Sequence, residues 1–270
     1  MTTQPLSAPQ RPRPAPLALG SLRTVPALML REMSTTYGRS AFGYLWAVLE
    51  PAAGIVLLTL AFSFAFRSPP IGTNFPIFYA SGMLPFLMYL HVSQKVATAI
   101  RFSKPLLFYP RVTFADALLA RFLLNALTQV AVFMIVLTSI IVIFNLNMII
   151  DPVAVILGIG MALMLAVGIG TLNCFLMSMF PGWERLWGIL TRPLFIISCI
   201  FFLFEVVPQP LQDYLWFNPL VHVVGQVRTG IYPTYSGDYI SPLYVMSVSL
   251  ICLFFGLLLL RRYSRQIVND

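Results

Sequence analysis

Two basic side chains lie one helical turn apart within a largely apolar stretch of this sequence. His91 and Lys95 have the i, i+4 spacing that places two side chains on the same face of a helix. Ionisable groups inside a membrane helix are energetically costly, and they commonly line the path of a charged substrate. Alternatively, Lys95 extends its ammonium group to the nearby membrane surface. We favour the substrate path, for an anionic substrate, because His91 shares the face.

A glutamate and a proline stand where a basic and aromatic segment meets a long apolar run. The segment 37–51 reads YGRSAFGYLWAVLEP and ends in Glu50 and Pro51. Glu50 either pairs with a basic neighbour, such as Arg39 or a residue of 101–121, or is an exposed carboxylate at the interface. Pro51 either begins a helix or kinks one, since proline suits both positions. The sequence leaves these alternatives open.

Several catalytic patterns are missing from the sequence. There is no Gly-Lys pair and therefore no phosphate-binding P-loop, and HExxH, CxxC and GxSxG patterns are also lacking. The three cysteines, Cys174, Cys199 and Cys252, lie in apolar runs without metal or disulfide spacing. We therefore expect a chain that is not an enzyme and that holds neither a metal nor a cofactor of its own.

The composition places these residues in a membrane protein. Hydrophobic residues make up 59% of the 270 residues and charged residues 10%, with a mean hydropathy of +0.85. Soluble proteins carry roughly a quarter charged residues. The net charge of +8 would suggest nucleic acid for a soluble protein, but here the basic residues lie between apolar runs of membrane-spanning length. The sequence thus predicts an all-α integral membrane protein without a nucleic-acid partner.

The apolar runs divide the chain into one transmembrane domain, 23–265, behind a disordered cytoplasmic tail, 1–22. An amphipathic helix at 25–37 is too short to span and is expected to lie on the membrane surface. The segment 208–230 is predicted to be re-entrant, because its apolar part is short and is broken at Asn218 and Pro219. Six transmembrane helices are predicted, at about 44–66, 77–100, 118–144, 153–180, 188–207 and 242–260.

The distribution of basic residues predicts the orientation. Arginine and lysine are frequent in the amino-terminal region, in 101–121, in 181–192 and after 260. The opposite side has Arg67 and Arg228 against Glu205, Asp213 and Asp238. Basic loops stay in the cytoplasm, so we expect both termini to be cytoplasmic.

Three motifs in a fixed order resemble a known family. They are YGRSAFGYLWAVLEP at 37–51, FYPRVTFADALLAR at 108–121 and NPLVHVVGQVRTGIYP at 218–233. Together they resemble the membrane subunit of capsular-polysaccharide ABC exporters, the KpsM-like branch of the ABC-2 permeases. The resemblance covers roughly residues 22–265.

The resemblance implies a homodimer of six-helix permeases joined to two copies of a separate cytoplasmic ATPase, which would bind ATP and magnesium. It implies export of a lipid-linked acidic capsular polysaccharide across a Gram-negative inner membrane, with periplasmic and outer-membrane proteins as further partners. It also implies that 25–37 is an interface helix and that the loop near 101–116 couples to the ATPase. The predicted coupling residues are Arg31, Glu32, Arg101, Lys104, Tyr109, Arg111 and Asp116.

Three further groups of residues complete the predicted site. The predicted hinge into the first span comprises Gly43, Glu50 and Pro51. The re-entrant segment is marked by Asn218, Pro219 and His222. The predicted substrate path combines cations with aromatic rings: Lys95, His91, Arg39, Tyr44, Trp46, Tyr89 and Arg228.

Three alternatives to the capsule exporter differ in the residues that they require. One is export of another lipid-linked glycan, of the O-antigen or teichoic-acid type. A second is an ion-driven secondary transporter, which usually has ionisable groups near the midplane and repeated halves, whereas this sequence shows neither acidic midplane residues nor matching halves. A membrane glycosyltransferase would need an acidic cluster at an interface, and none is seen. The motifs favour the capsule exporter.

Overall fold

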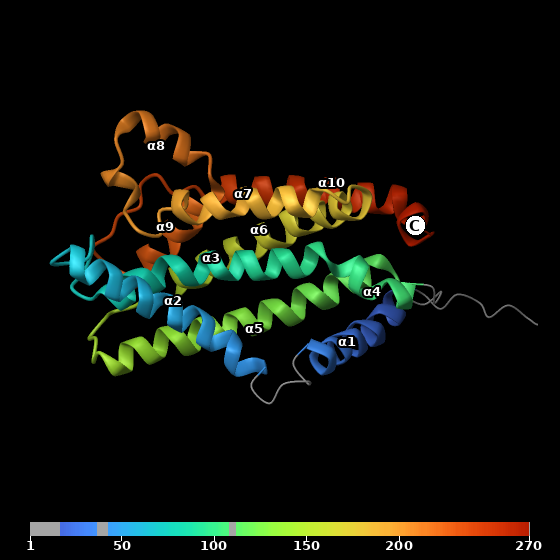
Figure 1. Ribbon diagram of the computed structural model, residues 1–270, viewed down its shortest axis with the longest axis horizontal. Coiled ribbons are helices and arrows are strands. Elements are labelled where there is room, and N and C mark those ends of the chain that lie inside the picture. Colours follow the sequence, from blue (N-terminus) through green and yellow to red (C-terminus); the bar gives the residue numbers. More distant parts are fainter. Residues whose placement is uncertain (1–16, 37–42, 108–111, 270) are drawn as a thin grey trace, which may run out of the picture.

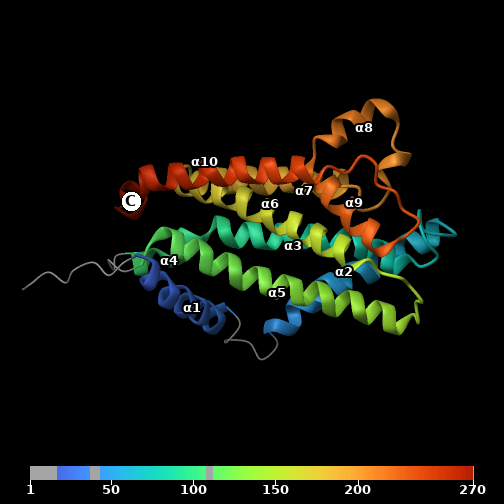
Figure 2. The same cartoon turned by 180° about the vertical axis from the view of Figure 1, so that it is seen from behind.

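The computed structural model describes residues 17–36, 43–107 and 112–269, and the regular elements in these ranges are all helical. Long helices run side by side along the longest axis of the molecule (Figure 1). Helices α1 (Leu17–Thr36) and α4 (Ala99–Leu107) lie at the same end as the carboxyl terminus. Helices α8 (Gln209–Trp216) and α9 (Pro219–Ile231) lie at the opposite end, which is also clear from behind (Figure 2).

Five helices of the described ranges are long and apolar enough to cross a membrane. One of these spans joins α3 and α4 into a single run, Phe75–Leu106. The all-helical membrane class expected from composition is therefore confirmed. The helices that fall on the predicted ranges are α2 (Gly43–Ala65), α3 (Phe75–Ala97), α5 (Phe114–Ile143), α6 (Pro152–Met179) and α10 (Pro242–Asn269).

The predicted fifth span, 188–207, differs from the structure. Helix α7 (Trp183–Ile197) has 15 residues and ends ten residues before the predicted end. Beyond it, Cys199 has a φ of 58°, and the short 3-10 helix η1 (Phe204–Val206) follows. The carbonyls of Ile200 and Phe202 accept hydrogen bonds from Arg228 of α9. These carbonyls therefore bind a side chain that is distant in sequence, and not the backbone N–H groups of a continuing helix. Apolar composition alone could not show this.

The core is built around α3 and α6, which pack against each other, with α5, α9 and α10 around them. Small residues allow this close packing. A Cβ added at Gly170 of α6 would lie 2.9 Å from the Ser93 carbonyl oxygen of α3. A Cβ added at Gly256 of α10 would lie 2.7 Å from the Leu172 backbone nitrogen of α6. Close approach of helix backbones is a common way to stabilise membrane bundles.

Candidate functional site

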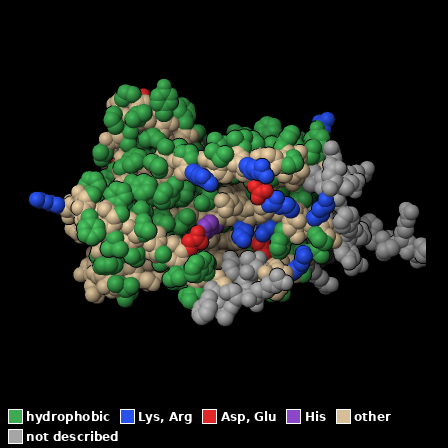
Figure 3. Space-filling view, viewed as in Figure 1, with side chains coloured by type: hydrophobic (Ala, Val, Ile, Leu, Met, Phe, Trp, Pro, Cys, Tyr) green, Lys and Arg blue, Asp and Glu red, His purple; other side chains and the backbone are tan. Residues whose placement is uncertain are grey.

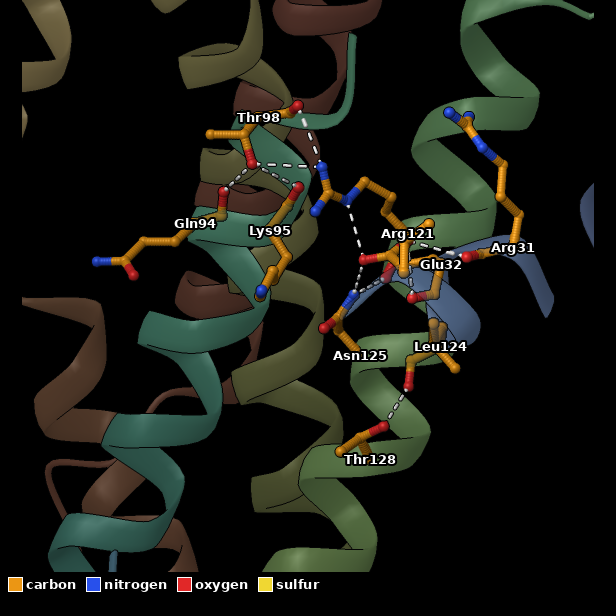
Figure 4. Close-up of polar contacts among 10 residues, drawn as sticks. Arg31, Glu32, Gln94, Lys95, Thr98, Arg121, Leu124, Asn125 and Thr128 are labelled. Carbon is orange, nitrogen blue, oxygen red and sulfur yellow. Dashed lines mark hydrogen bonds and ion pairs between the residues drawn. The ribbon is translucent and has the colours of Figure 1, made fainter. Parts of the chain in front are cut away.

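A buried ion pair fastens α1 to α5. Glu32 of α1 accepts hydrogen bonds at Oε1 from Arg121 Nε at 3.1 Å and from Asn125 Nδ2 at 3.2 Å, both on α5 (Figure 4). The side chains of Arg121 and Glu32 are 6% and 3% exposed. We call Glu32, Arg121 and Asn125 the α1–α5 junction. Separating the two side chains would leave an uncompensated buried charge, which is energetically costly. The junction therefore fixes the position of α1.

The same arginine also binds the bend between α3 and α4. Arg121 Nη1 donates to the Thr98 carbonyl oxygen at 3.2 Å, and Thr98 stands between the two helices. The Thr98 hydroxyl in turn donates to the Gln94 carbonyl oxygen at 3.1 Å. Arg121 is therefore shared by α1, α5 and the α3–α4 bend.

Lys95 lies on α3 beside this junction (Figure 4). Its side chain is half-buried, and its charge interacts with those of Arg121 and Glu32. Two cations thus stand near one carboxylate, which leaves this group of three with an excess positive charge. Such an excess in a partly buried place favours the approach of an anion.

One turn earlier, His91 lies between a carboxylate and an amide. His91 Nε2 is 3.6 Å from Glu50 Oε1 of α2, and Gln129 Nε2 of α5 is 3.0 Å from His91 Nδ1. The three side chains therefore tie α2, α3 and α5 together. In the described ranges the basic neighbour of Glu50 is thus His91, while the Glu50 side chain stays 54% exposed. Arg39 lies outside the described residues.

The predicted hinge residues belong to one continuous helix. Gly43 begins α2, and the helix continues through Pro51, which is buried, as far as Ala65. Pro51 therefore does not begin the helix. Whether these residues act as a hinge stays a prediction.

An exposed ion pair joins α4 to α7. Arg101 donates from Nη1 to Glu184 Oε2 at 2.8 Å and from Nη2 to Glu184 Oε1 at 3.0 Å. These hydrogen bonds hold the pKa of the Glu184 carboxyl below its ordinary value. Lys104 is half-buried on the same short helix. The pair connects the predicted coupling segment to the helix that precedes the 198–203 turn.

Asp116 has a local structural task. Its carboxylate accepts from the Thr113 backbone nitrogen at 3.0 Å and from the Thr113 hydroxyl at 2.7 Å, which completes a capping box at the start of α5. Asp116 is buried, so its carboxylate is occupied within the chain. Tyr109 and Arg111 lie outside the described residues. Their predicted coupling role and that of Asp116 stay predictions.

The aromatic residues of the predicted path lie in two different environments. Tyr44 and Trp46 near the start of α2 are 43% and 65% exposed. Tyr89 of α3 is 1% exposed and belongs to the hydrophobic core. The first two are therefore accessible from outside the chain, whereas Tyr89 is enclosed by it.

Arg228 of α9 is completely buried. It donates from Nη1 to the Phe202 carbonyl oxygen at 3.0 Å and from Nη2 to the Ile200 carbonyl oxygen at 2.9 Å. Its guanidinium carbon also lies 4.6 Å from the centre of the Phe78 ring of α3. These contacts place Arg228 far along the bundle from Lys95, where it holds the 198–203 turn. Arg228 is therefore enclosed by the chain, and its place in the substrate path stays a prediction.

The segment predicted to be re-entrant forms α8 and α9. Asn218 caps α9, accepting from the Leu220 backbone nitrogen at 3.1 Å and donating to the Ile197 carbonyl oxygen at 3.1 Å, and Pro219 begins the helix. His222 is buried, with Nε2 2.8 Å from the Trp216 carbonyl oxygen. Burial lowers the pKa of its imidazole. These residues fix α9 to the neighbouring turns.

Sequence reasoning missed four residues that the structure makes central: Arg121, Asn125, Gln129 and Glu184. Arg121, Asn125 and Gln129 recur at four-residue spacing along an otherwise apolar span. That spacing places them on the same helix face, and it was the signal that could have revealed them. Glu184 gave no comparable signal, because one acidic residue in a loop is common.

The described residues form a helical bundle with five helices that are long and apolar enough to cross a membrane. Residues 24–232 match the family described as ABC-2 type transporter. The chain belongs to this family.

Relatives with known names extend the match along nearly the whole chain. The chain is 34% identical to the polysialic acid transport protein KpsM of Escherichia coli, over 92% of this chain and 96% of that protein. It is 26% identical to the capsule polysaccharide export inner-membrane protein CtrC of Neisseria meningitidis serogroup B, over 91% and 92% of the two chains. It is 25% identical, with the same coverage, to the corresponding protein BexB of Haemophilus influenzae. The expected resemblance to capsule export permeases is thus confirmed.

Proposed function

We propose that this chain is the permease subunit of an ATP-driven exporter that moves a lipid-linked acidic capsular polysaccharide across a Gram-negative inner membrane. The observation that carries the proposal is similarity over more than nine tenths of the chain to three differently named proteins of capsule or polysialic acid export. The family match at residues 24–232 includes both predicted coupling segments. Polysialic acid, named for the first of these relatives, is itself an acidic glycan.

The proposed topology has six spans with both termini in the cytoplasm. Helix α7 would be the fifth span, although its 15 residues reach only about 22 Å of a roughly 30 Å hydrocarbon core. The turn at 198–203 and η1 would complete the crossing, and α8 and α9 would lie at the periplasmic side. Lysine and arginine side chains gather toward the α4 end of the face in Figure 3, which supports a cytoplasmic position for that end.

The proposed assembly contains two copies of this chain and two copies of a separate ATPase that binds ATP and magnesium. Helices α1 and α4 would meet the ATPase, since they lie together at the basic end of the bundle. Arg101 and Lys104 of α4 offer cations there, and the Glu32 ion pair would transmit force from α1 to α5. Periplasmic and outer-membrane capsule proteins would receive the polysaccharide on the other side.

The proposed substrate path begins at Lys95 and His91. Both side chains are half-buried on one face of α3, with Glu50 and Gln129 beside His91. The excess positive charge around Lys95 would attract phosphate or carboxylate groups of the glycan. Exposed aromatic rings at Tyr44 and Trp46 would offer stacking faces for sugars.

Deletion of the gene in its own bacterium tests the proposal. We expect surface capsule to disappear while acidic polysaccharide accumulates inside the cell, and a plasmid copy to restore export. Unchanged surface capsule in the deletion strain would refute the proposal. Loss of capsule without internal accumulation would point to synthesis in place of export, and would refute it as well.

A further inference from the structure

One aromatic ring of α4 lies close to two arginines from two other helices. The guanidinium carbon of Arg121, on α5, is 4.2 Å from the centre of the Phe102 ring. The guanidinium carbon of Arg31, on α1, is 5.6 Å from the same centre. Both distances are within the roughly 6 Å over which a cation is attracted to an aromatic face. Phe102 therefore contacts the charges of α1 and α5 at once.

The two arginines differ in what else they bind. Arg121 is already fixed by Glu32 and by the Thr98 carbonyl oxygen. Arg31 Nη1 is buried, and in the described part of the chain it has no hydrogen-bond partner. The Arg31 side chain as a whole is half-buried, but a buried N–H group without a hydrogen bond is costly unless some other group stabilises it. The Phe102 ring lies within range to supply that stabilisation.

The residue before Phe102 connects α4 in another direction. Arg101 forms its two hydrogen bonds with Glu184 of α7. Successive side chains on a helix point about 100° apart. Arg101 on one side of α4 therefore contacts α7, and Phe102 on another side contacts α1 and α5. A displacement of α4 would thus change the contacts of α4 with α1, α5 and α7.

We infer that Phe102 is the positioning residue through which a displacement of α4 reaches α1 and α5. This inference rests on the proposed function, in which an ATPase acts on α4. The attraction needs an aromatic face, because an aliphatic side chain of similar size fills the space but carries no negative π surface. Phe102 aligns helices and touches no substrate.

The test compares F102L with F102W in the full permease–ATPase complex. Leucine removes the ring, whereas tryptophan keeps an aromatic face for both guanidinium groups. Hydrogen exchange of the α1 amides is measured on the permease, and the ATP hydrolysed per polysaccharide exported is measured on the complex. In F102L we expect α1 exchange to rise roughly five- to thirtyfold, from the loss of two cation–π contacts, and the ATP used per exported chain to increase. In F102W we expect α1 exchange and the ATP used per exported chain to stay close to the wild-type values.

The outcomes separate this inference from the proposed function. A wild-type complex that exports no polysaccharide would refute the proposed function, while the exchange measurement would still show whether Phe102 fixes α1. Normal coupling in F102L, with or without faster exchange, would overturn the inference. If F102L fails to assemble, R31Q, which keeps the ring and removes one cation, must raise ATP use per export; normal coupling in R31Q would overturn the inference equally.

Discussion

Replacing Glu32 with glutamine should release α1 from the membrane bundle. Glu32 Oε1 accepts both Arg121 Nε and Asn125 Nδ2, and the side chains of the ion pair are 6% and 3% exposed. Glutamine keeps the shape and one acceptor oxygen but removes the charge, so Arg121 remains buried without a carboxylate. The change tests whether the α1–α5 junction holds the helix in place.

The expected magnitude follows from the burial of the pair. Removing one partner of a buried ion pair costs about 3–5 kcal/mol, and hydrogen bonds to charged groups contribute about 1.5–3 kcal/mol each. Since glutamine retains an acceptor, we expect the lower value, about 3 kcal/mol. At about 1.4 kcal/mol for each factor of ten, the local opening of α1 should become roughly 100-fold more frequent.

Hydrogen exchange of the α1 amides in purified protein measures this opening. The matched control is E184Q, which also removes the carboxylate of an arginine pair, but with side chains that are 63% and 50% exposed. An exposed pair contributes at most about 1 kcal/mol, so E184Q should leave α1 exchange nearly unchanged. The double variant E32Q/R121M should exchange more slowly than E32Q alone, because the unpaired buried charge is gone.

Two results would refute this reasoning. An increase of α1 exchange below about threefold in E32Q would mean that the buried pair does not hold the helix. An equal increase in E184Q would mean that α1 responds to charge loss anywhere at this end of the bundle.

Three further predictions concern export and packing. Lys95→Ala should reduce export about tenfold or more through the loss of a charge-assisted contact, with the ATPase still co-purifying; surface capsule at the wild-type level would remove Lys95 from the path. Gly170→Ala should destabilise the protein by about 1–3 kcal/mol, because the new Cβ would lie 2.9 Å from Val96 Cβ and from the Ser93 carbonyl oxygen. The control Gly160→Ala, with nothing within 4 Å of its added Cβ, should leave thermal unfolding unchanged or raise its midpoint. Arg228→Met should leave two carbonyls unpaired at a cost of about 2 kcal/mol, and faster proteolysis at 198–207 would reveal it, whereas a wild-type cleavage rate would contradict it.

The long helices could be predicted because apolar length is a local property. Runs such as 44–66 and 153–180 fall on helices of the structure with ends that differ by only a residue. The end of α7 could not be predicted in the same way. Arg228 is 28 residues from Ile200, and the hydrogen bond between them depends on how α9 folds back onto the turn.

Only part of the candidate site's composition could be predicted, and its pairing could not. Lys95 and His91 stood out because ionisable groups are rare in apolar runs, and Glu32 was predicted from the family resemblance. The partners Arg121 and Glu32 are 89 residues apart, and His91 and Gln129 are 38 apart. Packing of several helices brings such residues together, and a single sequence contains no local signal for it. Phe102 gave no signal either, because one phenylalanine among many is an ordinary apolar residue.

Transport by the purified proteins in vesicles tests the central claim most directly. The chain is reconstituted alone, and with its ATPase partner, into vesicles that contain the lipid-linked acidic polysaccharide. We predict that the chain alone hydrolyses no ATP and moves no polysaccharide, and that the complex moves polysaccharide across the membrane only when ATP is supplied. ATP hydrolysis by the chain alone, or translocation that needs neither ATP nor the partner, would contradict the account.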